Sequence, residues 1–269
     1  MPSRLTPEQV ETYRDTGYLL LKEPVFPAKK FKALKAHFEE KLQAWPVDKR
    51  PEAMDVPHFS DPALFEWLLA DEVLDLVEPL LGPDIALWAS HFICKPEGDG
   101  RKVPWHEDSA YWKNMIDPME VVTVWLAIDP SSEENGCMYV IPHTHRTGKR
   151  GFSDYVQVDP EKNVFGTEIT REQMRQDLAE PCILDENEAS LHDGRLMHGS
   201  PPNTSKIRRC GYTMRYISTR SRINPDLYPT HRIYLARGEA IAEQPEAYGD
   251  PTRPYDELVS ARSKRPSGH

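Results

Sequence analysis

A histidine and a carboxylate stand two positions apart in a segment too irregular for a helix, Val103-Pro-Trp-His-Glu-Asp-Ser-Ala-Tyr-Trp112. Side chains alternate faces along an extended strand, so His106 and Asp108 would point the same way. His198, far along the chain, is the best candidate for a third ligand. Two histidines and one carboxylate on one side of a metal ion leave three open positions, which is the ligand set of non-haem Fe(II) oxygenases.

The residues after His198 set this pattern apart from a chance His-x-Asp pair. Ser200, Asn203 and Ser205 follow it, and Arg209 opens a strand-like run. The order His-x-Asp, then His-x-Ser-x-x-Asn-x-Ser, then Arg resembles the phytanoyl-CoA dioxygenase-like branch of the Fe(II)/2-oxoglutarate dioxygenases. The resemblance covers most of residues 5 to 222. Its further matching stretches are Leu5-Thr-Pro-Glu-Gln9, Asp15-Thr-Gly-Tyr-Leu19, Val122-Thr-Val-Trp-Leu-Ala-Ile128 and Glu134-Asn-Gly-Cys-Met-Tyr-Val-Ile-Pro142.

The chain departs from the family pattern at two places. The family often has Gln between the two proximal ligands, where this chain has Glu107, an extra charge beside the predicted site. The family usually shows Pro-Gly-Ser-His where this chain has Pro142-His-Thr-His145. These departures concern substrate contacts and the shape of a loop, and they leave the three predicted ligands in place.

The resemblance implies a cofactor and two co-substrates. His106, Asp108 and His198 would hold Fe(II), 2-oxoglutarate would occupy two open positions, and dioxygen the third. Arg209 suits the far carboxylate of 2-oxoglutarate, because a guanidinium binds a carboxylate through two parallel hydrogen bonds and stays charged when partly buried. Ser200 lies on the same predicted face as His198 and could donate to that carboxylate.

Several other residues are candidates for contacts with the co-substrate or the substrate. Arg215 shares strand parity with Arg209 and is expected to point inward, toward the substrate, whereas Arg208 faces the other way. Lys95 and Trp125 stand where the family places further co-substrate contacts, although Trp125 would serve equally as a core aromatic. Three aromatic side chains flank the proximal ligands and could wall an apolar substrate pocket, or simply pack in the core: Trp105, Tyr111 and Trp112.

Other histidines are alternative ligands. His192, followed by Asp193, lacks the residues that trail His198, so we interpret it as a residue behind the ligands or in the core. His143 and His145 have strand spacing and would form a rival metal site if the resemblance were set aside.

The elements that must position these residues follow from the periodicity of the sequence. Thr6 caps a helix that Pro7 and Gln9 support and Gly17 ends. Helices are predicted at 6–17, 27–44 and 61–80, with a short one from Thr170, and strands at 18–21, 85–93, 121–128, 138–141, 181–184, 188–192 and 209–218.

Helices followed by many strands indicate an α+β fold, and the resemblance narrows it to a double-stranded β-helix, or cupin-like jelly roll, with N-terminal helices packed on one sheet. We expect a single oxygenase domain over residues 1–269. Its predicted parts are a mainly helical 1–83, a jelly-roll core 84–222 with a lid-like insertion at 146–180, and a surface tail at 238–269.

Composition limits the remaining possibilities. The 269 residues carry a formal net charge of −10, which argues against general binding of nucleic acid. No apolar run reaches the length of a membrane span and no signal pattern opens the chain, so we expect a cytoplasmic protein that does not enter membranes. The four cysteines lack paired spacing and are expected to be buried thiols. Nothing in the sequence indicates the oligomeric state.

Basic residues around Arg101, Arg146, Lys206 and Arg215 flank elements that should meet at the open end of the barrel. We therefore predict a small anionic substrate, attracted by a positive mouth. Hydroxylation of a C–H bond is the expected reaction, with desaturation or ring formation as alternatives, and Asp108 argues against a halogenase. Two alternatives from other functional classes are a catalytically silent binding protein on the same scaffold and a jelly-roll metal hydrolase or isomerase.

Overall fold

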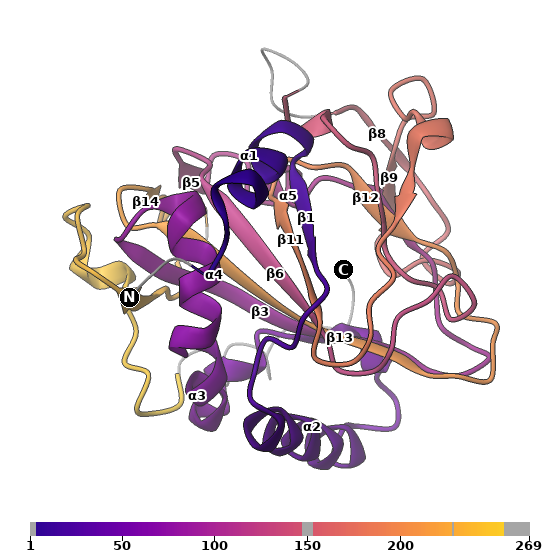
Figure 1. Ribbon diagram of the computed structural model, residues 1–269, viewed down its shortest axis with the longest axis horizontal. Coiled ribbons are helices and arrows are strands. Elements are labelled where there is room, and N and C mark those ends of the chain that lie inside the picture. Colours follow the sequence, from indigo (N-terminus) through magenta and orange to yellow (C-terminus); the bar gives the residue numbers. More distant parts are fainter. Residues whose placement is uncertain (1–3, 147–152, 228, 256–269) are drawn as a thin grey trace.

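The computed structural model describes residues 4–146, 153–227 and 229–255. Parts of the predicted insertion and tail, residues 147–152 and 256–269, therefore lie outside the described residues, as do the basic residues Lys149 and Arg150. Two antiparallel sheets dominate the described part (Figure 1). The larger sheet has seven strands, six of them in the order β1-β11-β6-β13-β3-β15, with β2 beside β3, and the smaller has the order β10-β7-β12-β4.

The strands of the larger sheet supply most of the apolar core. β3 and β13 are buried along almost their whole length, since helices cover one face of the sheet and the functional site lies on the other. The strands of this sheet are β1 (Tyr18–Leu21), β2 (Met54–Asp55), β3 (Ile85–Lys95), β6 (Val121–Ala127), β11 (Ala189–Asp193), β13 (Arg209–Ser218) and β15 (Tyr234–Arg237).

The smaller sheet carries the two predicted histidine ligands on adjacent strands, where His198 is the register partner of His106. Its strands are β4 (Val103–His106), β7 (Tyr139–Val140), β10 (Glu180–Pro181) and β12 (His198–Ser200). Two further pairs complete the described strands: β5 (Ile116–Asp117) with β14 (Arg222–Ile223), and β8 (Tyr155–Gln157) with β9 (Thr167–Ile169).

The helices form where their capping and their apolar faces predict them. Thr6 accepts a hydrogen bond from the Gln9 backbone and the Gln9 side chain accepts one from the Thr6 backbone, so the predicted capping box is confirmed. Gly17 ends the first helix with φ at 87°, a left-handed conformation that favours glycine. The helices are α1 (Pro7–Thr16), α2 (Ala28–Gln43), α3 (Phe65–Leu68), α4 (Asp71–Leu81) and α5 (Asp108–Tyr111).

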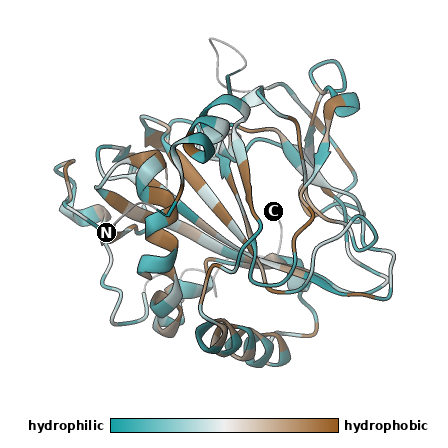
Figure 2. Ribbon diagram, viewed as in Figure 1, coloured by the Kyte–Doolittle hydropathy of each residue, from teal (hydrophilic) through white to brown (hydrophobic). Residues whose placement is uncertain are grey.

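The amphipathic pattern of the helices decides how they cover the sheet. α4 packs across β6 and β13 and buries Val73, Leu74, Leu76 and Val77. Figure 2 shows the hydrophobic colours concentrated on the central strands and on α4, with hydrophilic residues along the loops. None of the helices in the described ranges combines the length and the apolar character that a membrane crossing requires.

Three sequence predictions are wrong in detail. The strand expected at 181–184 is reduced to β10, which covers only Glu180–Pro181. The helix expected at 61–80 is divided, because the backbone at Ala70 is extended (ψ 138°) and separates α3 from α4. The helix expected from Thr170 is a turn followed by a short 3-10 segment, Gln176–Leu178. Here the Gln173 side chain pairs with both the backbone and the carboxylate of Asp154, tying together the two ends of the β8–β9 hairpin instead of supporting a helix.

The larger sheet also recruits strands from outside residues 84–222. β1, from the mainly helical part, pairs with β11, and β15 pairs with β3. The site therefore depends on chain segments from both sides of the predicted jelly-roll core.

Candidate active site

His106 and His198 are oriented by the backbone. Each is buried, and each donates from Nδ1 to the carbonyl oxygen two residues earlier, at 2.8 Å: Pro104 for His106 and Leu196 for His198. A carbonyl can only accept, so Nδ1 carries the proton in both rings and Nε2 is left as a lone-pair donor. The two ring centroids are 4.1 Å apart, which places these nitrogens on one side of the smaller sheet.

Asp108 completes the group, although not from a strand. β4 ends at His106, Glu107 is still extended, and Asp108 begins the one-turn helix α5, so the prediction of a fully extended segment is corrected. The extended Glu107 nevertheless keeps His106 and Asp108 on the same side, with Nε2 of the histidine 3.7 Å from Oδ1 of the aspartate. One potential ligand atom from each of the three predicted residues lies within 4.8 Å of the others.

The second oxygen of Asp108 is held by the larger sheet. Oδ2 accepts hydrogen bonds from Nε of Arg215 at 3.1 Å and from Oγ1 of Thr123 at 3.3 Å. These contacts leave Oδ1 facing the histidines, and they fix the carboxylate in an orientation that offers one oxygen to a metal ion.

The charges around the group keep its ligand atoms in their binding forms. Burial by itself raises the pKa of Asp108, but the Arg215 charge outweighs it and holds that pKa well below its usual value. Burial, followed by the nearby His106 and His192, holds the pKa of His198 well below its usual range. A metal ion binds carboxylate and neutral imidazole, so both residues are ready to act as ligands.

Glu107 faces away from the three residues. Its carboxylate accepts hydrogen bonds from the backbone and the hydroxyl of Ser153, both at 3.0 Å, and its own backbone N–H donates to Tyr155. The extra charge expected beside the site therefore anchors the insertion that contains β8 and β9.

A small cavity of about 30 Å³ adjoins the histidines on the inside of the barrel. Arg209 lines it, as predicted from its place at the start of β13. This side chain is 1% exposed and donates to the carbonyl of Gly136 and, at 3.2 Å, to Ser200 Oγ. Burial lowers the pKa of its guanidinium to about 10, so it stays charged at neutral pH. Among the described residues Arg209 has no carboxylate partner, and a buried charge without one needs an anionic ligand.

Lys95 supports this cavity from behind. Its ammonium donates to Ser200 Oγ at 2.7 Å and to the carbonyl of Pro201. Burial, and then the Arg209 charge, hold the pKa of Lys95 well below its usual range. Lys95 does not line the cavity itself, so it acts through Ser200, which does.

Trp125 lines the same cavity and also packs in the core, so both interpretations of this residue hold. Its ring lies 5.3 Å from the guanidinium carbon of Arg209 and packs with Ala127 and Leu184. Gly211 provides the room for the ring, because a Cβ at Gly211 would lie 2.0 Å from Trp125 Cζ2.

We expect Gly211→Ala to displace the Trp125 ring and to lower the free energy of unfolding by about 1–3 kcal/mol, the usual effect of overpacking a core. Thermal or urea unfolding measures the loss. Gly166→Ala is the matched control, since a Cβ there has no atom within 4 Å. Equal stability of the two variants would contradict this packing.

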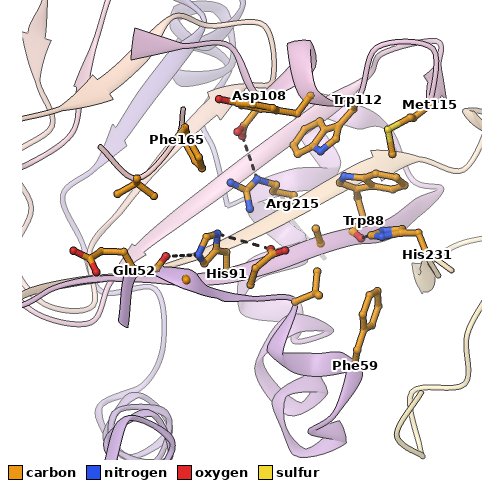
Figure 3. A pocket seen from close by; sticks show the side chains of 16 residues that line it. Glu52, Phe59, Trp88, His91, Asp108, Trp112, Met115, Phe165, Arg215 and His231 are labelled. Atoms are coloured by element: carbon orange, nitrogen blue, oxygen red, sulfur yellow. Dashed lines mark hydrogen bonds and ion pairs between the residues drawn. The ribbon is translucent and has the colours of Figure 1, made fainter. Parts of the chain in front are cut away.

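A larger cavity of about 430 Å³, a volume that suits a small molecule, opens on the other side of Arg215 (Figure 3). Asp108 and Arg215 lie at one side of it, Trp88, Trp112 and Met115 form an apolar wall, and His91 lies opposite Asp108. Arg215 and Phe165 line both this cavity and the smaller one.

The aromatic side chains expected around the ligands divide between two environments. Tyr111 and Trp112 line the larger cavity. Trp105 lies on the opposite side of β4 from His106, packs with Ile141 and Met197, and lines neither cavity, so we leave it out of the candidate substrate site.

Several lining residues escaped the sequence analysis. Phe165 comes from the insertion and contacts the ring of His106, with centroids 5.0 Å apart. Trp88 and His91 come from β3, where a polar residue in an apolar strand was the available signal for His91. Trp88 faces the cavity together with Ala89 because the register shifts opposite it, between Arg215 and Tyr216, which interrupts strand alternation.

Several of the basic residues expected at the mouth of the site pair with carboxylates in the structure. Arg146 pairs with Asp15 beside α1, Lys102 pairs with Glu168, and Arg208 pairs with Glu39 and Asp129. Arg215 is the one arginine or lysine among the described residues that lines the larger cavity, and Glu52 and Asp55 line it too. Arg146, Lys102 and Arg208 are thus neutralised by local carboxylates, and these three residues give no support to attraction of an anion by a general positive field.

The rival histidine pair lies elsewhere. His143 and His145 contact the backbone of Asp15 and Arg14 at the end of α1, outside both cavities. In the part of the chain that the structure describes, His106, Asp108 and His198 form the group whose spacing suits a metal ion.

A family model described as phytanoyl-CoA dioxygenase (PhyH) matches residues 13–211, a stretch that contains all three ligand candidates and Arg209. The chain belongs to the phytanoyl-CoA dioxygenase family. The resemblance read from the ligand pattern is therefore confirmed.

Relatives of this phytanoyl-CoA dioxygenase family member support the assignment. A probable alpha-ketoglutarate-dependent hypophosphite dioxygenase of Stutzerimonas stutzeri is 31% identical over 161 residues, which cover 57% of this chain and 52% of that protein. The peroxisomal phytanoyl-CoA dioxygenase of Homo sapiens is 28% identical over 166 residues, or 53% of this chain and 48% of that one. The chain thus spans about half the length of the curated relatives it matches.

Solved structures match over most of the chain. The apo form of the non-haem monooxygenase ThoJ superposes with a TM-score of 0.72 at 21% identity, covering 94% of this chain and 92% of that one. EctD from S. alaskensis, solved with 2-oxoglutarate and 5-hydroxyectoine, superposes with a TM-score of 0.67 at 19% identity, covering 83% and 79%. At this identity the match concerns the fold, and it confirms the predicted jelly roll with N-terminal helices.

Proposed function

We propose that this member of the phytanoyl-CoA dioxygenase family is an Fe(II)- and 2-oxoglutarate-dependent dioxygenase that hydroxylates a C–H bond of a small molecule. One observation carries the proposal. The two histidines of a buried His-Asp-His group line the same small cavity as Arg209, a buried cation without a carboxylate partner among the described residues. A metal hydrolase or isomerase gives that cation no role, and the complete His-Asp-His group beside it argues against a catalytically silent protein.

The donor set fits iron. Two imidazole nitrogens held as lone-pair donors and one carboxylate oxygen provide the three protein ligands of the facial triad, and leave room for co-substrates. When bound there, iron would supply the oxidising chemistry, in which dioxygen and 2-oxoglutarate are converted to succinate and CO₂ while the second oxygen atom enters the substrate as a hydroxyl group.

The residues of the chain would bind and orient 2-oxoglutarate. Arg209 would form paired hydrogen bonds with the distal carboxylate, with Ser200 as a second donor. Lys95 would keep the Ser200 hydroxyl in place, and Trp125 would close the cavity against water.

The larger cavity would hold the substrate. Its apolar wall of Trp88, Trp112 and Met115 suits a hydrocarbon or ring portion, while Arg215 offers a charged donor at the end nearest Asp108. We propose that the substrate carries a carboxylate, phosphate or phosphonate group and that Arg215 binds this group. The phosphorus oxyanion in the name of the Stutzerimonas relative agrees with this class.

The experiment that tests the function is turnover of 2-oxoglutarate by the purified chain with Fe(II) and dioxygen. We expect succinate to form slowly without substrate and faster with a suitable small anion, whose product gains one oxygen atom in mass. Absence of succinate under all substrate conditions would contradict the proposal. A product that lost two hydrogens would show desaturation or ring formation instead of hydroxylation. The single-domain organisation and the cytoplasmic location stay predictions.

A further inference from the structure

His192 is a third histidine beside the two ligand candidates. It lies on β11, in register with Thr123 of β6 on one side and Tyr18 of β1 on the other. Its side chain is 1% exposed and lines the same small cavity as Arg209. The ring centroid is 4.7 Å from that of His198, so His192 sits at the metal-binding end of the cavity.

Neither ring nitrogen of His192 has a hydrogen-bond partner among the described residues. The other buried histidines of the described chain each have one: Pro104 for His106, Leu196 for His198, Ser90 for His58, Glu52 for His91 and Trp88 for His231. A buried polar atom left without a partner costs about 1–3 kcal/mol. His192 therefore lacks a partner that a bound molecule would provide.

The carboxylate of Asp108 does not fill this role. Its Oδ2 is 3.9 Å from Nε2 of His192, beyond hydrogen-bond distance, and it already accepts from Arg215 and Thr123. Bound 2-oxoglutarate would bring further acceptors into the cavity, at both of its ends. Arg209 stands where the distal carboxylate would lie, and His192 stands beside the ligands, where the keto-acid end would lie.

We propose that His192 donates a hydrogen bond to an oxygen of the keto-acid end of 2-oxoglutarate and so positions it at the metal. The proposal rests on the proposed function. An imidazole carries at least one N–H in either of its protonation states, so it can donate a hydrogen bond in both.

The test compares two co-substrates that share the keto-acid end. Pyruvate has that end but lacks the distal carboxylate that Arg209 would bind. Binding of 2-oxoglutarate and of pyruvate to the Fe(II)-loaded protein is followed without oxygen, through the visible charge-transfer absorption of an iron–keto-acid complex. His192→Leu removes both ring nitrogens and keeps an apolar side chain, while His192→Gln keeps an N–H donor.

We expect His192→Leu to weaken binding of both compounds by a similar factor, about 10-fold or more, the usual range for a hydrogen bond to a charged group. His192→Gln should recover part of the loss. Arg209→Met should weaken binding of 2-oxoglutarate and leave pyruvate unchanged, which serves as the matched control. If His192 only filled space in the core, its replacement would lower the melting temperature without weakening the binding of 2-oxoglutarate and pyruvate by a similar factor.

Wild-type affinity of His192→Leu for both compounds would overturn the proposal, as would a loss confined to Fe(II) affinity or to 2-oxoglutarate. If His192→Leu does not fold, His192→Phe takes its place under the same criteria.

If the wild-type protein itself fails to bind 2-oxoglutarate with Fe(II), the proposed function is rejected. If the wild-type protein binds 2-oxoglutarate and the His192 variants bind it equally well, only the role of His192 is rejected.

Discussion

Replacing His198 with alanine is expected to abolish Fe(II)-dependent formation of succinate. His198 offers one of three buried potential ligand atoms within 4.8 Å of each other, and the remaining two would hold iron weakly and without a fixed orientation. Succinate production and Fe(II) affinity are measured together, because both should fall. Ala substitution of His106 or Asp108 should have the same consequence.

His145→Ala is the control for this prediction. Its ring contacts the backbone of Arg14 beside α1, away from both cavities, so its loss should leave turnover unchanged. Full activity of His198→Ala together with inactivity of His145→Ala or His192→Ala would show that iron is bound by another set of ligands.

Replacing Arg209 with alanine is expected to weaken binding of 2-oxoglutarate by about 2–5 kcal/mol, as for a buried charge that loses its partner. The guanidinium is buried beside Ser200 and Trp125 and has no carboxylate partner among the described residues. Arg209→Lys should recover only part of the affinity, because an ammonium lacks the planar arrangement of donors. Titration calorimetry with 2-oxoglutarate measures the change.

The variant Arg215→Ala distinguishes the role of Arg215 from that of Arg209, since both side chains point into the barrel. Arg215 binds Asp108 and lines the larger cavity, so its loss should disturb metal binding and substrate turnover more than the affinity for 2-oxoglutarate. Unchanged 2-oxoglutarate affinity in Arg209→Ala, with a loss in Arg215→Ala, would transfer the role of co-substrate anchor to Arg215.

The sequence predicted the parts of the site that follow from local spacing. Strand alternation placed His106 on the face that looks inward and brought Arg209 and Arg215 to one side of β13, where both line cavities. The order of residues in the family motif identified His198 as the third ligand candidate. His198 is the register partner of His106 in the smaller sheet. Local rules were also sufficient for the cap at Thr6, whose partner is three residues away.

The parts that sequence could not predict depend on contacts between distant segments. The register shift beside Arg215 turns Trp88 toward the cavity, and no local signal in an apolar strand marks such a shift. Phe165 contacts His106, and the insertion that carries it is tied to the site by contacts such as the hydrogen bond between Ser153 and Glu107. Strand alternation correctly predicted that Arg208 points away from the site. The pairing of Arg146 with Asp15 could not be predicted, because it joins residues far apart in the sequence.

The central position of β13 has a consequence for how the protein acquires its activity. β13 lies between β6 and β3, and its pairing of Arg209 with Lys95 joins residues roughly a hundred positions apart in the chain. During synthesis, β3 and β6 would leave the ribosome before β13, so the edges that pair with β13 would be exposed until it is made. Exposed strand edges favour slow folding and recruitment of chaperones. Arg209 and Arg215 arrive with that strand, so a partly made chain would have no complete co-substrate cavity. Under the proposed function, turnover would begin only once the sheet has closed.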